Sequence, residues 1–264
     1  MKESSASTLP SPVLCILFSS GGTADVGRHA VQAAIETYDG PIRVLTRDTQ
    51  VLQEANWNCA CPEPHQLELQ RLDVRAVDVN KDDLKEHLKD VGIVISALGN
   101  RQPFHGDCVA QAGTRNLVNA MLHHNISRLV IITSAGCNED FPPMEYHWTG
   151  TILRCLFRSV SRREYRDLCL AEDVLRNHEQ SDQLDYLIVR PVGLSEERPP
   201  VHAWVIQKQK YEDKLGPDMS KMDCARFCLQ EALQPTYHRQ AVVIGSDPET
   251  FVFNPNKSLK SNRD

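Results

Sequence analysis

The sequence predicts an α/β fold in which a doubly wound parallel sheet carries helices on both faces. The first observation is the stretch at residues 13–27, VLCILFSSGGTADVG, where six apolar residues precede a glycine-containing turn and then helically spaced apolar residues from Val26. The second is that apolar runs alternate with helix-like segments as far as Gly245, the pattern of parallel strands joined by crossover helices. Near-continuous apolar runs are also typical of strands buried on both faces.

Composition limits the classes of function. The 264 residues are 41% hydrophobic and 24% charged, as in an ordinary globular protein. The net charge of −6 disfavours nucleic acid as a partner, because that polyanion attracts chains rich in lysine and arginine. Nine irregularly spaced cysteines indicate reduced thiols, mostly small core residues, and a cytoplasmic location. No apolar run approaches the roughly 18 residues of a membrane-spanning helix, so we expect a soluble chain with no transmembrane segment.

The expected elements follow the apolar pattern in order. The strand at 91–99 is the most apolar and is expected at the centre of the sheet. Ser220 is expected to cap the last helix. Strands are predicted at residues 13–18, 41–45, 72–79, 91–99, 127–133, 184–190 and 241–245. Helices are predicted from Val26 onward and at residues 81–90, 105–124, 168–176 and 220–233.

Small and polar residues follow the predicted strands. Ligands of parallel sheets lie at the carboxyl ends of the strands, so one binding edge is expected to carry Gly21, Arg47, Asp78, Leu98 and Ser134. A glycine turn before a helix lets a phosphate approach the amides at the helix amino terminus. A dinucleotide site is therefore the leading hypothesis, and a glycine-rich turn without a ligand is the alternative.

Arg47 bears on the identity of the cofactor. At the end of the second strand an arginine suits the 2′-phosphate of NADP, whereas an acidic residue suits the ribose hydroxyl of NAD. Arg47 therefore favours NADP, and the neighbouring Asp48 leaves NAD open as the less favoured cofactor. A solvated charge at a strand end is the other interpretation of Arg47.

One segment has the residue types of a metal site. Cys59, Cys61 and His65 lie close together in the sequence, but no second pair of ligands completes a tetrahedral set. We therefore expect an insertion loop and no bound metal.

Arginines recur at four-residue spacing from Arg154 to Arg166. If this stretch is one continuous helix, it is amphipathic and basic, because apolar residues such as Leu156 and Val160 lie off the arginine face. The alternatives left open are a solvated charged face, a contact with an anionic substrate, a protein partner, or an anionic membrane surface.

A family resemblance rests on an ordered set of motifs over residues 13–246. The set resembles that of atypical short-chain dehydrogenase/reductases, closest to the NmrA-like and flavin (biliverdin-IXβ) reductase-type NAD(P)-binding proteins, whose fold is the Rossmann fold. The motifs are GGTADVG, LTRD, VDV, ISALG, AGTRNLVNAMLHHNISRLVIITSAG, AEDVLRNHEQSDQLDYLIVRPVGL and MSKMDCARFCLQEAL.

The resemblance implies a set of residues at the cofactor. The phosphate turn and helix start would supply Gly21, Gly22, Thr23, Ala24, Val26 and Gly27. Arg47 would meet the adenosine phosphate, Asp78 and Val79 the adenine, and the segment Ala97, Leu98 and Gly99 a ribose. The nicotinamide side would be formed by Thr133, Ser134, Pro191 and Val192.

The sequence also departs from that family pattern. Ala24 stands where the family usually has a glycine, and Asp25 adds negative charge beside the expected phosphate. The Tyr-x-x-x-Lys pair, in which a nearby cation lowers the pKa of a phenol, is missing. The residues four positions after the six tyrosines are Ile42, Gly150, Cys169, Arg190, Leu215 and Ala241.

The expected function is NADPH-dependent reduction of a small conjugated or aromatic acceptor, with Ser134 and Tyr165 as the catalytic candidates. The alternative is a non-catalytic, NADP-binding redox sensor or scaffold, which the missing tyrosine–lysine pair favours. The expected organisation is a flexible segment at 1–12, one NAD(P)-binding domain at 13–247 with substrate-side elements at about 141–235, and a tail at 248–264.

Overall fold

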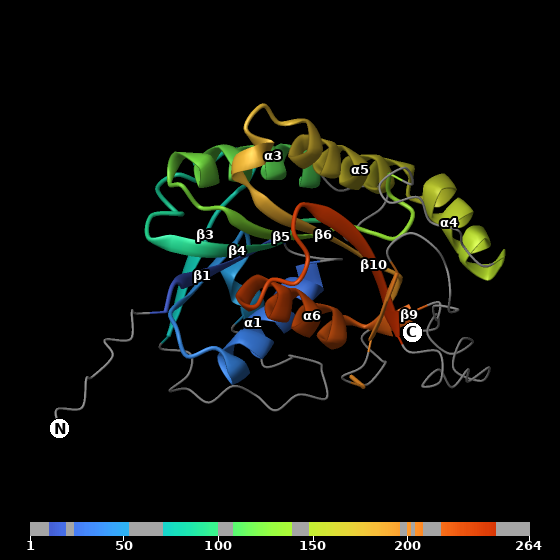
Figure 1. Ribbon diagram of the computed structural model, residues 1–264, viewed down its shortest axis with the longest axis horizontal. Coiled ribbons are helices and arrows are strands. Elements are labelled where there is room, and N and C mark those ends of the chain that lie inside the picture. Colours follow the sequence, from blue (N-terminus) through green and yellow to red (C-terminus); the bar gives the residue numbers. More distant parts are fainter. Residues whose placement is uncertain are drawn as a thin grey trace, which may run out of the picture.

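An eight-stranded sheet forms the middle layer of the molecule (Figure 1). The computed structural model describes residues 11–19, 24–52, 71–99, 108–138, 148–195, 200–201, 204–207 and 218–246. The strands lie in the order β3-β2-β1-β4-β5-β6-β10-β8, and each neighbouring pair is parallel except β10 and β8. A separate parallel pair joins β7 (Gly193–Ser195) to β9 (Asp218–Ser220). The main strands are β1 (Val13–Phe18), β2 (Ile42–Thr46), β3 (Leu72–Ala76), β4 (Val91–Ala97), β5 (Arg128–Ile132), β6 (Asp185–Pro191), β8 (Trp204–Gln207) and β10 (Gln240–Ser246).

Helices cover both faces of this sheet. Figure 1 shows α1 and α6 below the sheet and α3 and α5 above it, with α4 at the periphery. Each pair of covering helices buries its own apolar cluster against one face of the strands. The α-helices are α1 (Ala24–Thr37), α3 (Ala110–His123), α4 (Trp148–Val160), α5 (Arg162–Asn177) and α6 (Lys221–Leu233), and short 3₁₀ turns lie at η1 (Thr49–Leu52) and η2 (Ser181–Gln183).

The predicted doubly wound parallel sheet is confirmed. The strand order runs outward from β1 to β3 on one side and from β4 to β6 on the other, so the direction of winding reverses between β1 and β4. Strand β4 lies between β1 and β5, as predicted for the most apolar strand. Ser220 caps α6 as expected, because its Oγ accepts a hydrogen bond from Met222 N at 3.2 Å.

The helix predicted at residues 81–90 is wrong. The chain forms successive turns there, although Leu84 and Leu88 are fully buried as the helical spacing required. Aspartate side chains compete for the backbone amides of this segment: Asp83 Oδ1 accepts from Lys85 N at 3.0 Å, a local bond that favours a turn over a helix. Apolar spacing alone could not distinguish a helix from successive turns here, since tight turns also place two leucines on the same buried side of the segment.

The third strand is shorter than predicted. It ends at Ala76, which pairs with the last residue of β2, Thr46. Past that point the Asp78 carboxylate accepts from Asn80 N at 3.1 Å and turns the chain away from the sheet. Residues 78 and 79 therefore follow the strand at its carboxyl end.

The basic stretch is not one continuous helix. Ser161 has the non-helical angles φ −108° and ψ 43° and separates α4 from α5. Leu156 and Val160 are exposed on α4. Arg158 of α4 and Arg162 and Arg166 of α5 line one pocket across this break.

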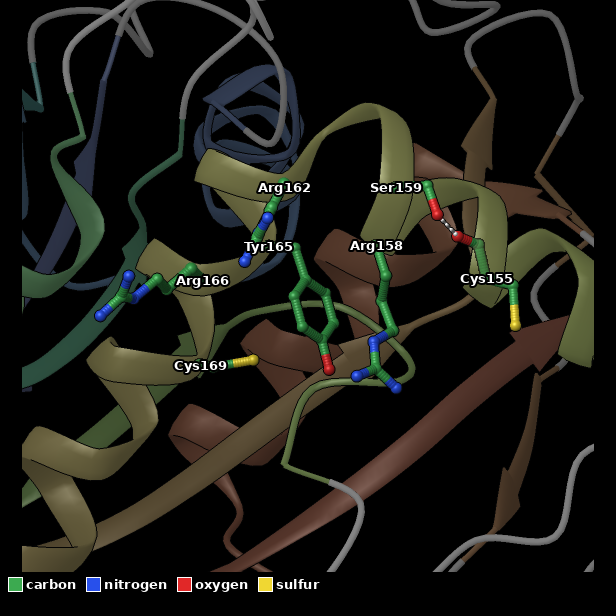
Figure 2. Close-up of a pocket in the computed structure, with 7 residues that line it drawn as sticks. All are labelled: Cys155, Arg158, Ser159, Arg162, Tyr165, Arg166 and Cys169. Carbon is green, nitrogen blue, oxygen red and sulfur yellow. Dashed lines mark hydrogen bonds between the residues drawn. The ribbon is translucent and has the colours of Figure 1, made fainter.

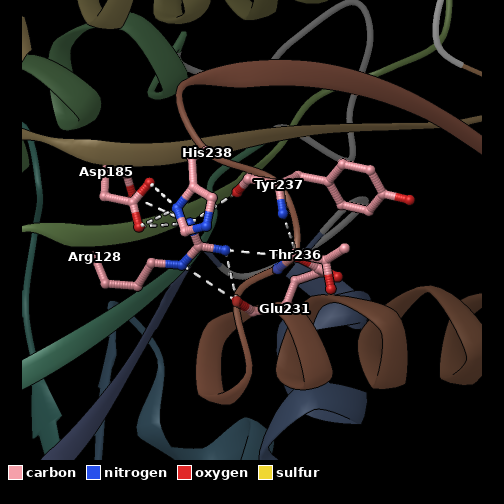
Figure 3. A network of polar contacts seen from close by, with 6 residues as sticks. All are labelled: Arg128, Asp185, Glu231, Thr236, Tyr237 and His238. Atoms are coloured by element: carbon pink, nitrogen blue, oxygen red, sulfur yellow. Dashed lines mark hydrogen bonds and ion pairs between the residues drawn. The ribbon is translucent and has the colours of Figure 1, made fainter.

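A polar cluster at the amino edge of the sheet joins three elements (Figure 3). Arg128 begins β5 and is 7% exposed; it lies 3.1 Å from the Asp185 carboxylate at the start of β6 and 3.7 Å from Glu231 of α6. Its guanidinium also donates to the carbonyl oxygens of Glu231 and Tyr237. Burial lowers the pKa of Arg128, and the two carboxylates oppose that shift.

Replacing Arg128 by methionine should lower the free energy of unfolding by about 3–5 kcal/mol, because Glu231 then stays buried without its cation. Urea denaturation followed by circular dichroism measures this loss. The matched control is Arg226→Met, which removes a more exposed pair between α6 and Glu36 and should cost less than about 1 kcal/mol. Equal losses in the two variants would contradict the special role given to Arg128.

Within the described ranges, none of the helices has both the length and the apolar character needed to cross a membrane. The described residues contain no group of three or more His, Cys, Asp or Glu side chains placed to hold a metal ion. Cys59, Cys61 and His65 lie outside those residues.

Candidate functional site

The carboxyl ends of the parallel strands meet at one edge of the sheet. The point where the winding reverses, between β1 and β4, is where doubly wound folds open a crevice for ligands. Ser19 directly follows β1 and Gly99 lies two residues beyond the end of β4. The Ser19 hydroxyl donates to the Gly99 carbonyl and accepts from Gly99 N, the latter at 3.2 Å. This buried bridge fixes the two strand ends at the reversal point.

The phosphate turn is described only where α1 begins. Gly21, Gly22 and Thr23 lie outside the described residues, and of Ala24 only the backbone, the first residue of α1, is described. Val26 is fully buried.

Gly27 is the point of closest contact between α1 and β1. A Cβ at this position would lie 2.5 Å from Phe18 Cβ, so a side chain there would push the helix away from the strand. The glycine thus brings the amino end of α1 close to the end of β1, next to the expected phosphate position.

Arg47 and Asp78 lie at the ends of two neighbouring strands. Arg47 directly follows β2 and is exposed, so its guanidinium is accessible to solvent and to a ligand. The Asp78 carboxylate is bound by the ammonium of Lys81 at 3.0 Å, and this contact is the main reason that the pKa of Asp78 is lowered. Asp78 is therefore a carboxylate at neutral pH, an acceptor as the adenine assignment requires.

Helix α3 holds the neighbouring backbone in place. Asn116 Nδ2 donates to Val79 O at 3.1 Å and to Asp82 O at 2.7 Å. A Cβ on Gly113 would lie 2.6 Å from Leu98 Cδ1 and 2.9 Å from Val79 Cγ2, so α3 approaches both segments closely. Ala97 and Leu98 are buried. Because the side chains of residues 97 and 98 are directed into the protein, a ligand here would meet backbone atoms.

The ends of β5 and β6 form the other half of the edge. Ala135 N donates to Pro191 O at 2.9 Å, and Val192 N donates to Ile244 O at 3.0 Å. Ser134 Oγ lies 3.4 Å from Ala135 O, the long end of hydrogen-bond range, so this half-buried hydroxyl can turn toward a ligand at small cost.

A buried ion pair lies beneath these strand ends. Arg190 of β6 is 1% exposed and Glu172 of α5 is 0% exposed. Arg190 Nε donates to Glu172 Oε1 at 3.0 Å and Nη2 donates to Oε2 at 2.5 Å. The Thr133 hydroxyl also donates to Oε1, at 2.7 Å. That bond directs the side chain of Thr133 toward α5, so a ligand at the edge would meet the backbone of this residue.

The loop after β5 is fastened to α5. Tyr165 Oη donates to Gly136 O at 2.8 Å. Asn138 Nδ2 lies 3.0 Å from Cys169 O, 3.1 Å from Glu172 Oε2 and 3.2 Å from Asp173 Oδ1. Asn138 has a positive φ of 38°, a conformation that asparagine tolerates better than most residues.

A pocket of about 750 Å³ opens between α4 and α5 (Figure 2). It adjoins the carboxyl edge of the sheet, because Tyr165 lines it and is bonded to the loop after β5. The Arg158 guanidinium carbon lies 5.5 Å from the centre of the Tyr165 ring, a cation–π contact. The lining residues are Cys155, Arg158, Ser159, Arg162, Tyr165, Arg166 and Cys169.

The environment of Tyr165 keeps its phenol protonated. Burial is the main cause that raises its pKa, and negative charge on Cys169 adds to it. A tyrosine that is paired with lysine has its pKa shifted in the opposite direction. Here the residue one helical turn later is Cys169, and the hydroxyl is engaged with Gly136 O. Use of Tyr165 as an acid would require that bond to break.

The sequence matches a known family over most of its length. A family model described as NAD(P)H-binding matches residues 21–235. The chain belongs to this NAD(P)H-binding family. The match begins at Gly21 and spans every residue that the sequence assigned to the cofactor, from the phosphate turn to Val192. No curated protein matches the chain by sequence.

Solved structures share the fold of this NAD(P)H-binding protein. ChuY from Escherichia coli O157:H7, described as an anaerobillin reductase, has a TM-score of 0.64 and 20% identity, with 92% of this chain and 100% of that chain covered. A short-chain dehydrogenase/reductase from Veillonella parvula in complex with NADP has a TM-score of 0.64 and 15% identity, covering 91% and 97%. The oxidoreductase ylbE from Lactococcus lactis has a TM-score of 0.63 and 15% identity, covering 88% and 90%.

Several residues of the site were not found from the sequence. Ser19 follows the first apolar run directly, and that position was the only signal of its role. Glu172 and Arg190 are 18 residues apart within one motif of the family resemblance, but nothing in that motif indicates that they pair, and only the fold brings them together. The sequence does not distinguish Cys169 from the other cysteines, and in the structure it lines the pocket.

Replacing Asn138 by alanine should lower the free energy of unfolding by about 2–4 kcal/mol. Three acceptors lose their donor, and alanine is strained at a φ of 38°. Asn138→Gly loses the same hydrogen bonds without that strain and should be about 1 kcal/mol more stable than the alanine variant. Urea denaturation compares the three proteins. An alanine variant as stable as the wild type would refute the role of Asn138 in holding the loop after β5 against α5.

Proposed function

We propose that the protein is an NADPH-dependent reductase of a small conjugated or aromatic acceptor. The observation that carries the proposal is the position of the α4–α5 pocket, which adjoins the edge of the sheet where this fold binds dinucleotides. A reductase needs an acceptor site beside the cofactor site, and the pocket is placed to serve as one. The oxidoreductase descriptions of ChuY and ylbE support the same reaction class.

The described residues fit a bound NADP. The amino end of α1 lies close to the end of β1 because of Gly27, and its backbone amides would hold the pyrophosphate. Arg47 is exposed at the end of β2 and would bind the 2′-phosphate. Asp78 and Val79 would lie along the adenine, and Ala97, Leu98 and Gly99 along a ribose. The neighbour from Veillonella parvula is a complex with NADP, which supports this choice of cofactor.

The chain's contribution to catalysis is mainly orientation. When bound, NADPH supplies the hydride. The segment from Pro191 to Gly193 would support the nicotinamide from below, and the Ser134 hydroxyl would donate to the acceptor or to the cofactor amide. The pocket would hold the acceptor beside the ring. Tyr165 is the candidate proton donor, provided that its bond to Gly136 O is exchanged for one to the acceptor.

A binding-only regulator is the second candidate. The observation that favours it is the pair Tyr165 and Cys169, in which a thiol stands where a lysine would activate the phenol. Such a protein would bind NADPH without oxidising it. The two functions therefore differ in the fate of the bound cofactor.

Adding NADPH to the purified protein should raise its Tm, because a ligand that binds only the folded state stabilises it. A concentration of one hundred times Kd should give a stabilisation of about 2.7 kcal/mol. A panel of quinones, flavins and aldehydes should then reveal at least one acceptor that consumes NADPH, followed by its absorbance. A rise in Tm without oxidation of NADPH across the panel would favour the regulator, and an unchanged Tm would contradict both functions.

Arg47→Glu should weaken NADPH binding by about ten- to a hundredfold and leave NADH binding within about threefold. Loss of a charged hydrogen bond to the 2′-phosphate costs about 1.5–3 kcal/mol, and NADH lacks that group. Fluorescence titration of each cofactor measures the two values of Kd. Lys89→Glu is the matched control, because it makes the same charge change at an exposed position just before β4, at the opposite edge of the sheet. Equal weakening of both cofactors would reject the assignment of Arg47.

A further inference from the structure

The loop after β5 is attached to α5 on both sides of Cys137. On one side the Gly136 carbonyl accepts from Tyr165 Oη at 2.8 Å. On the other side Asn138 Nδ2 donates to Cys169 O at 3.0 Å and to Glu172 Oε2 at 3.1 Å. Because residues 136 and 138 are both held against the helix, residue 137 has little freedom to move away from it.

These attachments bring two thiols together. Cys137 is 1% exposed, and its thiol lies close enough to that of Cys169 for each to shift the pKa of the other. Tyr165 and Cys169 lie one helical turn apart on α5, and each side chain shifts the pKa of the other. Two cysteines 32 positions apart in the sequence therefore form a close pair that the fold holds in place.

Cys169 is accessible to a small molecule, whereas Cys137 is not. The Cys169 side chain is half-buried and lines the pocket between α4 and α5, and Figure 2 shows its sulfur directed toward Tyr165. Arginines 158, 162 and 166 line the same pocket. Their positive charge favours the approach of anions to the pocket.

The groups around Cys169 favour its thiolate on balance. The hydrogen bond from Cys137 is the largest effect, and the Asn138 backbone and Tyr165 add to it, so the pKa of Cys169 falls to about 7. Burial and the charge of Glu172 oppose this shift. Within the pair, the pKa of Cys137 is raised well above its usual value by the same hydrogen bond and by burial, while Arg190 opposes the rise.

We propose that Cys169 and Cys137 form a peroxide-reactive thiol pair, in which Cys169 is the attacking cysteine and Cys137 the resolving one. Nothing in the hydride-transfer reaction uses these thiols, so the pair is a second chemical site beside the pocket. The geometry supports it: Cys169 lines the pocket, Cys137 is buried in the loop that packs against α5, and hydrogen bonds hold that loop and the helix together.

The chemistry balances with hydrogen peroxide as the oxidant. The Cys169 thiolate attacks one peroxide oxygen; the S–O bond forms, the O–O bond breaks, and hydroxide leaves and takes a proton to become water. The Cys137 thiol then attacks the sulfenic acid sulfur, and a second water leaves as the disulfide forms. In total two thiols and one hydrogen peroxide give one disulfide and two waters.

The first test is a peptide map of the full-length protein after reduction, removal of the reductant and treatment with hydrogen peroxide. We expect a peptide that contains the disulfide between Cys137 and Cys169. Cys137→Ala should stop at the sulfenic acid, so dimedone labelling of Cys169 should increase several-fold over the wild type. Cys155→Ser removes an exposed thiol from the same pocket and should form the disulfide as the wild type does.

The second test is the pH dependence of alkylation by iodoacetamide in the wild-type protein, read cysteine by cysteine. The rate at Cys169 should be half-maximal near its pKa of about 7 and level off about one to two pH units higher, whereas the rate at exposed Cys108, whose pKa burial raises, should still increase above pH 9. Both tests are independent of NADPH, so a failure of the proposed reductase activity would not affect them. A wild-type map without the disulfide, or matching pH profiles for the two cysteines, would overturn the proposal.

Discussion

The site depends on the buried ion pair between Arg190 and Glu172. Two charges removed from water are costly unless every donor and acceptor is satisfied, and here Thr133 and Asn138 fill the remaining positions on the carboxylate. The pair joins α5 to the ends of β5 and β6. Through α5 it sets the position of Tyr165 and Cys169 over the loop that follows β5. The Arg190–Glu172 ion pair therefore helps to hold the pocket, the strand ends and the thiol pair in position.

The two edges of the sheet differ in their chemistry for a physical reason. At the amino edge, Arg128 bonds to the backbone and carboxylates of neighbouring elements, and its donors are directed into the protein. At the carboxyl edge the strands end in small or hydroxyl-bearing residues such as Ser19, Gly99 and Ser134. A ligand can approach backbone atoms there, because few large side chains stand in the way. One edge thus stabilises the fold and the other is left open for binding.

The surroundings of Tyr165 shift the pKa of its phenol in the opposite direction from that expected of a tyrosine–lysine pair. A lysine would lower the pKa of the phenol, whereas burial and the neighbouring Cys169 raise it. The pKa of the Cys169 thiol is lowered, mainly by Cys137 and to a smaller extent by the Asn138 backbone and Tyr165. The proton is thus held more tightly by the tyrosine and less tightly by the cysteine. An environment that is poor for acid–base catalysis by a phenol is favourable for a reactive thiolate.

The sequence by itself determined the parallel sheet, its central strand and the places of Arg47, Asp78, Leu98 and Ser134 after the strands, because apolar strands and the residues that follow them are local patterns. Only the tertiary structure decided the features that depend on distant residues. The leucines at 84 and 88 are buried in turns, since aspartates compete for the amides. The arginine stretch breaks at Ser161 and closes a pocket. Glu172 meets Arg190, and Cys137 meets Cys169, because packing of α5 on the sheet brings them together, and no spacing in the sequence encodes that contact.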